Sequence, residues 1–382
     1  MKYVFMFLIF FSFVQAQNNY KKQPPAEMIM MIEFADEDEV ELIEDFTEFL
    51  EDEDGAVDIY VESVETSVDV GDFVGSGSFK VALLVPSKVI GSYVNSVSNS
   101  IISYLLFKDA EFIFEVFDSK DESGDALVSK LSEIKAKGYR FVIAPLTKSG
   151  AEIISSNSLD LLIFIPTINK NDIYETPSNI IFGGIDYRKQ LDVLLSFANE
   201  KIALFGDGSR LSSDLSQYTK ELAYENIVYV KDIKNIKTNL SFIRGNSKLK
   251  KSSIFLNMPV VKSSLIASQL TQYKVKPHVL LSTQVNYNPL IFKFTQFRDR
   301  EFFYIANSIS HMNPILKDIN FVLGNSPDYN WIDYSSSIGI DYVFSSGESG
   351  VFDEEFYNNQ IDYKVQIVKA GKSSFLKVGV RE

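Results

Sequence analysis

Small polar residues gather in five short segments of the chain, each at the point where an apolar run ends. Hydroxyl groups and backbone N–H groups at a helix start are suited to holding a small carboxylate or phosphate, and a nearby lysine adds positive charge. The same residue types are also ordinary helix caps and turn formers. The pattern predicts a site for a small anionic ligand, and its candidate residues are Ser87, Thr147, Lys148, Ser149, Gly150, Thr167, Asp207, Ser209 and Thr283.

The residues available do not match the usual signatures of enzymes and metal sites. The chain has no cysteine and two histidines, His278 and His311, which excludes thiol nucleophiles, disulfides and sites with several Cys or His ligands. The GSGS segment at 75–78 precedes a predicted strand, whereas a dinucleotide-binding loop follows one. The GESGV segment at 347–351 lacks the last glycine of a nucleophile elbow. We therefore expect no catalytic residue, no metal and no cofactor.

From residue 79 onward, apolar runs alternate with amphipathic segments, and this pattern predicts strands and helices in alternation. Such an order is typical of right-handed crossovers and of a parallel sheet covered on both faces. A first series has predicted strands at 80–85, 111–117, 140–144, 161–165 and about 179–182, with helices at 89–107, 124–137 and 149–155. A second series has strands at 201–205, 227–230, 253–256 and 277–281, with helices at 187–199, 209–224, 232–244 and 261–273.

Each series begins with a K-[VI]-A-L strand, which indicates two similar units. We expect an α/β fold of two doubly wound parallel-sheet lobes with a cleft between them, and ligands in such sheets bind beyond the carboxyl ends of the strands. Lobe 1 is assigned to 79–186 and lobe 2 to 187–324. The segment at about 325–350 is expected to cross back to lobe 1, with a helix and then a strand over 331–344, and a C-terminal hairpin at about 360–380 is expected to join lobe 2.

Residues 1–16 have the features of a secretory signal peptide. Lys2 provides the positive start, a 12-residue apolar stretch follows, and Val14 and Ala16 are the small residues of a cleavage site. A bilayer takes about 20 apolar residues, so this stretch is too short to span one, and no later segment is a spanning candidate. We expect cleavage after Ala16 and a location in the periplasm.

The net charge of −14 comes from one tract. Residues 27–72 include 19 acidic residues and no Lys or Arg, whereas residues 80–382 hold 32 acidic and 34 basic residues. Like charges repel each other, so residues 17–78 are expected to form an acidic, largely disordered arm. The arm and the near-neutral body both oppose binding to nucleic acid. The basic cluster of Lys248, Lys250 and Lys251 is expected to be a solvated turn.

Apolar residues within the arm recur at the spacing of a short amphipathic helix. Such a tract is either a solvated spacer or a motif that binds a groove on a basic partner, with the apolar stripe as its anchor. The alternating segment 57–61 would also suit an edge strand. The candidate partner-binding residues are Leu42, Ile43, Phe46, Phe49 and Leu50.

Several segments of the body resemble the type I periplasmic binding proteins, the two-lobed fold of amino-acid receptors in ABC transport. Within that superfamily they are similar to the branch that includes the LppC/LpoA-type outer-membrane activators of cell-wall synthases. The segments that carry this resemblance are KVALLVPS (80–87), RFVIAPLTKSGAEII (140–154), LLIFIPT (161–167), IFGGIDYRKQLDVLLSFA (181–198) and KIALFGD (201–207).

The resemblance implies that Thr147 to Gly150 form the loop where transport receptors hold the carboxylate of an amino acid, and that Thr167 lies on the next loop. The first loop, 86–91, lacks the Thr-Gly usual in amino-acid receptors, and the lipid-modified cysteine of the activators is absent. We therefore expect a non-enzymatic periplasmic scaffold with an envelope protein partner, serving cell-wall synthesis or a flagellar or secretion machine. The alternative is an ABC-transporter receptor for an amino acid or a similar small anion.

Overall fold

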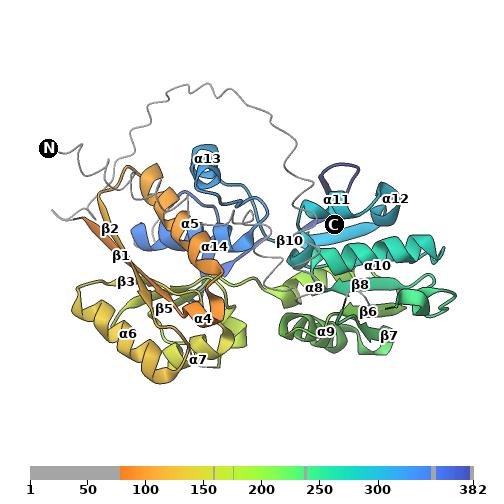
Figure 1. Ribbon diagram of the computed structural model, residues 1–382, viewed down its shortest axis with the longest axis horizontal. Coiled ribbons are helices and arrows are strands. Elements are labelled where there is room, and N and C mark those ends of the chain that lie inside the picture. The colour runs from red at the N-terminus through yellow and green to blue at the C-terminus, as the bar shows by residue number, and fades with distance from the viewer. Residues whose placement is uncertain (1–77, 158–159, 175, 236–238, 346–349, 379–382) are drawn as a thin grey trace.

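The computed structural model describes residues 78–378 apart from 158–159, 175, 236–238 and 346–349. These residues form two lobes, each built on a seven-stranded sheet with helices on its faces (Figure 1). The expected signal peptide and nearly all of the arm lie outside the described residues. The same holds for the candidate partner-binding residues Leu42, Ile43, Phe46, Phe49 and Leu50.

The sheet of lobe 1 has the strand order β11-β12-β5-β4-β3-β1-β2. All neighbouring strands in it run parallel except the pair at the β11 edge. Strand β1 lies in the interior of the sheet, and its residues from Val81 to Val85 are buried, which explains why all five are apolar. The strands are β1 (Phe79–Val85), β2 (Phe112–Asp118), β3 (Phe141–Ile143), β4 (Leu162–Ile165), β5 (Ile180–Phe182), β11 (Glu355–Tyr357) and β12 (Gln360–Asp362).

Two apolar cores cover the faces of this sheet. Tyr104 and Leu105 pack on one face, and Leu127 and Leu131 pack on the other. The first face carries α5 (Tyr93–Phe107), α13 (Pro314–Val322) and α14 (Trp331–Phe344), and the second carries α6 (Gly124–Ala136) and α7 (Lys148–Ser156). The short α4 (Ser87–Ile90) and the 3-10 turn η2 (Lys170–Asp172) follow β1 and β4.

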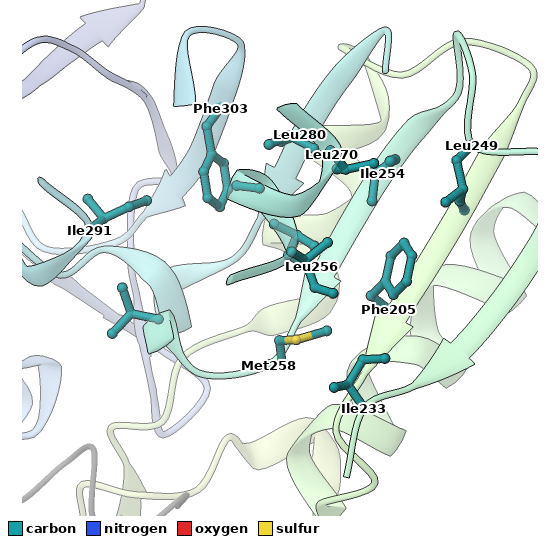
Figure 2. Packing of buried hydrophobic residues seen from close by; sticks show 14 of the residues in the cluster. Phe205, Ile233, Leu249, Ile254, Leu256, Met258, Leu270, Leu280, Ile291 and Phe303 are labelled. Atoms are coloured by element: carbon teal, nitrogen blue, oxygen red, sulfur yellow. The ribbon is translucent and has the colours of Figure 1, made fainter. Parts of the chain in front are cut away.

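Lobe 2 repeats the pattern with the order β14-β13-β10-β9-β8-β6-β7. The three central residues of β8 are all apolar because both faces of the strand are covered: Ile254 and Leu256 face one core, whereas Phe255 faces the other. Figure 2 shows Phe205, Leu256 and Leu280 in the first of these cores. The strands are β6 (Ile202–Gly206), β7 (Ile227–Asp232), β8 (Ser253–Asn257), β9 (Val279–Ser282), β10 (Phe303–Asn307), β13 (Gln366–Ala370) and β14 (Phe375–Val378).

Helices cover both faces of the second sheet as well (Figure 1). Side chains of α8 (Tyr187–Leu195) and α9 (Arg210–Ala223) pack in one core, and those of α10 (Val260–Gln272) and α11 (Leu290–Phe294) pack in the other. The 3-10 turns η3 (Tyr224–Asn226), η4 (Leu240–Ile243) and η5 (Gln284–Asn286) and the short α12 (Phe297–Arg300) complete the lobe. The expected fold class, two mostly parallel α/β lobes, is confirmed.

Three details of the predicted elements are wrong. The helix predicted over 89–107 is interrupted after Ile90, and the next helix begins at Tyr93. Of the helix predicted over 232–244, the described part contains only the short 3-10 turn η4. At its start, Ile233 instead donates a 2.7 Å backbone hydrogen bond to Gly206 and so continues the pairing of β7 with β6. The strand predicted at the end of 331–344 belongs to α14, whose apolar positions suit a helix buried on nearly every side.

The chain crosses between the lobes three times, after β5, after β10 and after β12. The middle crossing occurs before α13, because α13 packs against α5 of lobe 1. Strand β12 then pairs with β5 of lobe 1, and the hairpin β13–β14 pairs with β10 of lobe 2. The returning segment is thus longer than the expected 325–350, and the part assigned to lobe 2 between about 314 and 324 lies on lobe 1.

Candidate functional site

The loop that begins α7 holds a carboxylate that belongs to the protein itself. The Thr147 backbone N–H donates a 2.7 Å hydrogen bond to Glu122 Oε1, and the Thr147 hydroxyl donates to Glu122 Oε2. Thr147 is the N-cap residue of α7. Glu122 therefore sits where the helix dipole and the free N–H groups favour an anion.

Gly150 makes room for this carboxylate. A Cβ atom built on Gly150 would lie 2.6 Å from Glu122 Cδ, so any larger residue would push the Glu122 side chain away. The glycine in the first turn of α7 and the glutamate after β2 fit together. The segment that resembles a receptor's carboxylate-binding loop is thus matched to an internal glutamate.

A second internal carboxylate covers the loop after β1. The Ser87 hydroxyl donates to Asp118 Oδ2 at 2.8 Å, and its N–H donates to Asp118 Oδ1 at 3.2 Å. Lys120 donates to the same carboxylate from its N–H and from its ammonium group. Burial alone would raise the pKa of Asp118, but the hydrogen bonds from Lys120 and Ser87 outweigh it and hold this pKa below its usual range. Asp118 is accordingly a stable anion.

The remaining candidates of lobe 1 differ in their roles. Thr167 is tied to the neighbouring loop, because its hydroxyl donates to the Leu146 carbonyl at 2.5 Å and accepts from the Leu146 N–H at 2.9 Å. Lys148 is half-buried, and its charge lowers the pKa of Asp172 on η2. Ser149 is exposed. Within this lobe Ser87, Thr147 and Thr167 all have internal partners.

In lobe 2, the loop after the first strand, β6, contributes to a buried ion pair. Asp207 follows β6, and its Oδ2 lies 3.7 Å from Lys262 Nζ, with both side chains 2% exposed. Asp207 Oδ1 also accepts a 3.0 Å hydrogen bond from the Ser209 N–H. Ser209 is the N-cap of α9, where its hydroxyl accepts from the Ser212 N–H at 3.2 Å. Ser209 therefore acts as a helix cap.

Thr283, the last candidate, is fully buried after β9, and its hydroxyl has no hydrogen-bond partner among the described residues. A small cavity lies nearby in the lobe and is lined in part by Asn257, Pro259 and Val285. Its volume is about 10 Å³, roughly the space that one water molecule needs. This cavity is too small for an amino acid.

The two lobes touch directly where α9 faces η2. The Tyr218 hydroxyl of lobe 2 donates a 2.9 Å hydrogen bond to Asp172 Oδ1 of lobe 1. Burial raises the pKa of Asp172, while the Tyr218 hydrogen bond and the charge of Lys148 oppose that rise. Burial and the neighbouring Asp172 carboxylate raise the pKa of Tyr218. The contact closes the lobes on each other without a ligand between these two groups.

Aromatic rings form a second contact between the lobes. Tyr329, which precedes α14 of lobe 1, has its ring centroid 5.5 Å from that of Tyr287 and 6.3 Å from that of Phe375. Tyr287 and Phe375 belong to lobe 2 and lie 4.7 Å from each other. Such aromatic packing stabilises the closed arrangement through buried apolar area and ring contacts.

Side chains also brace the crossings between the lobes. The Tyr363 hydroxyl donates to the Gly183 carbonyl at 2.7 Å, which joins the third crossing to the first. The hydroxyls of Ser310, in the middle crossing, and Tyr334 both donate to Glu354, and the two hydroxyl oxygens lie 2.7 Å apart. The side chains around these contacts leave no space for a water molecule: Ile185, Ser308, Ile309, Trp331, Tyr334 and Tyr363. The hinge is therefore tightly packed.

Sequence reasoning placed the candidate loops correctly at the carboxyl ends of strands but missed the residues that fill them. Asp118 and Glu122 lie in the acid-rich segment DSKDE at 118–122, which directly follows a predicted strand, and this was an available signal. Lys262 had none, because a single lysine in an apolar helical pattern gives no sign of facing inward. Five of the predicted residues have polar partners within their own lobe: Ser87, Thr147, Thr167, Asp207 and Ser209.

Among the described residues, no group of three or more Asp, Glu or His side chains is placed to hold a metal ion. In the same part of the chain, no helix combines the length and the apolar character needed to span a membrane.

Comparison with known proteins finds similarity in structure only. No family model matches the sequence, and no curated protein matches it. The C-domain of LpoA (YraM) from Haemophilus influenzae, a regulator of PBP1A, is 11% identical over 78% of this chain and all of that domain, with a TM-score of 0.53. The chain spans 60% of the length of LpoA itself from that organism, at 10% identity and a TM-score of 0.54.

Receptors of small solutes are similar to the same extent. A putative branched-chain amino-acid ABC transporter protein from Rhodospirillum rubrum is 9% identical over 79% of this chain and all of its own length, with a TM-score of 0.59. LivJ from Streptococcus pneumoniae, solved with isoleucine, is 8% identical over 79% of this chain, with a TM-score of 0.52. The chain has the type I periplasmic binding protein-like fold.

Proposed function

We propose that this protein is a non-enzymatic interaction protein of the periplasm, in which a binding-protein fold serves as a closed scaffold for a cell-envelope assembly. The observation that carries the proposal is the Glu122 carboxylate on the start of α7. A solute receptor needs that position free for its ligand, because one helix start cannot bind two carboxylates at once.

The contacts between the lobes support the same proposal. A receptor of this fold opens and closes around its ligand, so its hinge must bend. Here Tyr218 bridges to Asp172, Tyr329 packs on Tyr287, and the Tyr363 hydroxyl ties two crossings together. A body held in one arrangement is suited to presenting a fixed surface to a partner.

The setting of the proposal comes from two further observations. Residues 1–16 have the sequence features of a leader for export, a positive start followed by an apolar stretch and a small-residue cleavage site. The LpoA structures supply the model for the role, since LpoA is a regulator of PBP1A and its C-domain has the same fold. By analogy with LpoA, we propose that the partner is a protein of a cell-envelope assembly. Residues 42–50 are the proposed partner-binding segment.

Calorimetry of the full chain against amino acids and small carboxylates tests the proposal. We expect no ligand with a micromolar Kd and no ligand-induced rise in melting temperature. A true ligand at 100 times its Kd would stabilise the protein by about 2.7 kcal/mol, which is easily measured. A micromolar ligand that changes the scattering profile would overturn the scaffold and establish the alternative, a solute receptor.

The variant Glu122→Ala sharpens the test, with Glu152→Ala on the outer part of α7 as a matched control. Removing the Glu122 side chain vacates the start of α7, so weak carboxylate binding should appear in this variant alone. Binding by the unaltered chain at the same strength would show that Glu122 does not block the position.

A further inference from the structure

The charges of the body are shared unequally between the lobes. The segments of lobe 1, 79–186 and 311–362, hold 22 acidic and 11 basic residues. The segments of lobe 2, 187–310 and 363–382, hold 10 acidic and 23 basic residues. The near-neutral total of the body conceals an acidic lobe 1 and a basic lobe 2. The acidic arm precedes the acidic lobe in the chain.

Part of this positive charge gathers on the loops that precede β8 and β9. The Lys251 N–H donates to the Lys276 carbonyl at 2.9 Å and the His278 N–H donates to the Ser252 carbonyl at 2.8 Å, so the two loops lie side by side. Six basic side chains on them are exposed, and none forms an ion pair with another described residue. We call this surface the basic end: Arg244, Lys248, Lys250, Lys251, Lys274 and Lys276.

Aromatic groups adjoin the basic end. The Arg244 guanidinium lies 4.9 Å from the centre of the Tyr273 ring. Phe302 is 50% exposed, and its carbonyl accepts a 2.9 Å hydrogen bond from the N–H of Leu280 on β9. The exposed acidic residues Glu200 and Glu301 lie on the loops before the neighbouring strands β6 and β10. The surface therefore combines a clear excess of positive charge with exposed apolar area.

Two of the lysines occupy unfavourable backbone positions. Lys251 has φ 58° and Lys274 has φ 57°, in the left-handed region where glycine is the usual residue. An L-residue there costs about 1–2 kcal/mol. A charged side chain is thus present at two positions of the basic end where the backbone alone would favour glycine.

We propose that the basic end is the docking surface for the chain's own acidic arm, residues 27–72. The arm has 19 acidic and no basic residues, and its apolar residues at 42–50 match the exposed Phe302 ring and the half-buried Tyr273 ring beside the lysines. The 28 residues from 51 to 78 reach up to about 90 Å at about 3.3 Å per residue. A compact body of about 300 residues has a radius of gyration of about 19 Å, so the arm is long enough to cross lobe 1.

This inference goes beyond the proposed scaffold role and does not depend on which envelope protein is the partner. An arm docked on lobe 2 is masked, and a basic partner must displace it. Partner binding therefore competes with the basic end of the same molecule for residues 42–50.

Fluorescence energy transfer in the full chain tests the docking, since a chain without cysteine can be labelled at engineered pairs alone. One pair joins the arm to the basic end (Thr47→Cys with Ser247→Cys), and another joins the arm to lobe 1 (Thr47→Cys with Ser132→Cys). An undocked arm, attached at Phe79, stays closer to lobe 1. We expect the greater transfer with the Ser247 pair, at nanomolar protein where contacts between copies do not form.

Salt and charge reversal provide the controls. Raising the salt from 0.1 M to 1 M shortens the screening length from about 10 Å to about 3 Å, and the Ser247 pair should lose about half of its transfer or more. Lys248→Glu, Lys250→Glu and Lys274→Glu together should cause the same loss. The matched variant Lys231→Glu, Lys293→Glu and Lys377→Glu changes the net charge equally in lobe 2 and should keep the transfer.

Three results would overturn the proposal. Greater transfer to Ser132 than to Ser247 would show an undocked arm. Transfer to Ser247 that appears only as the protein concentration rises would show docking between copies. Binding of the full chain to phosphatidylglycerol vesicles that is lost in the Lys248, Lys250 and Lys274 variant would show that the basic end is free and faces a membrane.

Discussion

The two lobes solve the same electrostatic problem in different ways. At the carboxyl ends of its strands, lobe 1 covers helix starts with two of its own carboxylates, Asp118 and Glu122. At the matching position, lobe 2 buries an aspartate against a lysine, Asp207 with Lys262. In lobe 1, solvent-accessible carboxylates therefore accept hydrogen bonds at helix starts. In lobe 2, a carboxylate is paired with a lysine that is buried away from solvent.

This difference means that the carboxylates of lobe 1 matter mainly for anion binding, whereas the ion pair of lobe 2 matters mainly for stability. A half-exposed carboxylate such as Glu122 can be removed at modest cost to stability, because water can then solvate the N–H groups that it leaves. A buried pair is not exchangeable, since removing one partner leaves a charge without solvent. We therefore expect substitutions in lobe 2 to affect unfolding most strongly, and substitutions in lobe 1 to affect which anions the protein accepts.

The largest effect is expected for Lys262→Met, which leaves Asp207 buried without its cation. The free energy of unfolding should fall by about 3–5 kcal/mol in urea denaturation. Lys231→Met on β7, an exposed lysine of the same lobe, should change it by less than about 0.5 kcal/mol. Adding Asp207→Asn to Lys262→Met should restore part of the loss. An equal loss from both lysine variants would contradict the contrast between the lobes.

The contact between the lobes is expected to show a smaller effect. Tyr218→Phe removes the hydrogen bond to Asp172 and should cost about 1 kcal/mol. Loss of this bond should also raise the pKa of Asp172 further, because the Tyr218 hydrogen bond opposes the rise that burial causes. Small-angle scattering should report a larger radius of gyration. Tyr224→Phe, at a tyrosine that is 78% exposed, serves as the control. It should leave the free energy of unfolding, the pKa of Asp172 and the radius of gyration unchanged.

An increase in stability is expected for Lys274→Gly. The substitution relieves a positive φ at the residue after the C-cap of α10 and should raise the free energy of unfolding by about 1 kcal/mol. The same substitution removes one charge of the basic end. The melting temperature should therefore rise in this variant, whereas the energy transfer from the arm to the basic end should fall. A fall in stability would show that Lys274 makes a compensating contact.

The smallest effect concerns pH and Asp118. Because hydrogen bonds hold the folded-state pKa of Asp118 below its usual 3.8, this group stabilises the folded protein above that value. The contribution is lost as the pH falls below 3.8 toward the folded-state pKa. Relative to Asp118→Asn, the unaltered chain should gain less than about 1 kcal/mol at pH 7, and the gain should shrink by pH 3. A gain that grows toward acid pH would reverse the sign of this argument.

Local patterns were sufficient to predict most strands and helices of both lobes. Strand β1 and strand β6 are apolar at nearly every position because both of their faces are covered, and such runs are visible in any sequence. The same cue failed at the end of α14, where the apolar residues belong to a helix that is buried on nearly every side. Apolar content alone does not separate a central strand from a central helix.

The arrangement of the candidate site was not predictable in the same way. Thr147 and Gly150 were found because they follow a strand, but Glu122 comes from another loop and meets them only in the folded lobe. Likewise, the basic end contains Lys248 and Lys250 from one loop and Lys274 and Lys276 from another, and the pairing of β8 with β9 brings these loops together. A charge count along the chain shows neither grouping.

The sequence by itself determined the two-lobed α/β fold and the tract of acidic residues at 27–72, because both depend on residue types that lie close together in the chain. Only the tertiary structure decided that internal carboxylates fill the helix starts of lobe 1, that the hinge is braced, and that positive charge gathers on lobe 2. These features depend on contacts between residues far apart in the chain, and hydrogen bonds and charges act over distances in space that sequence order does not encode.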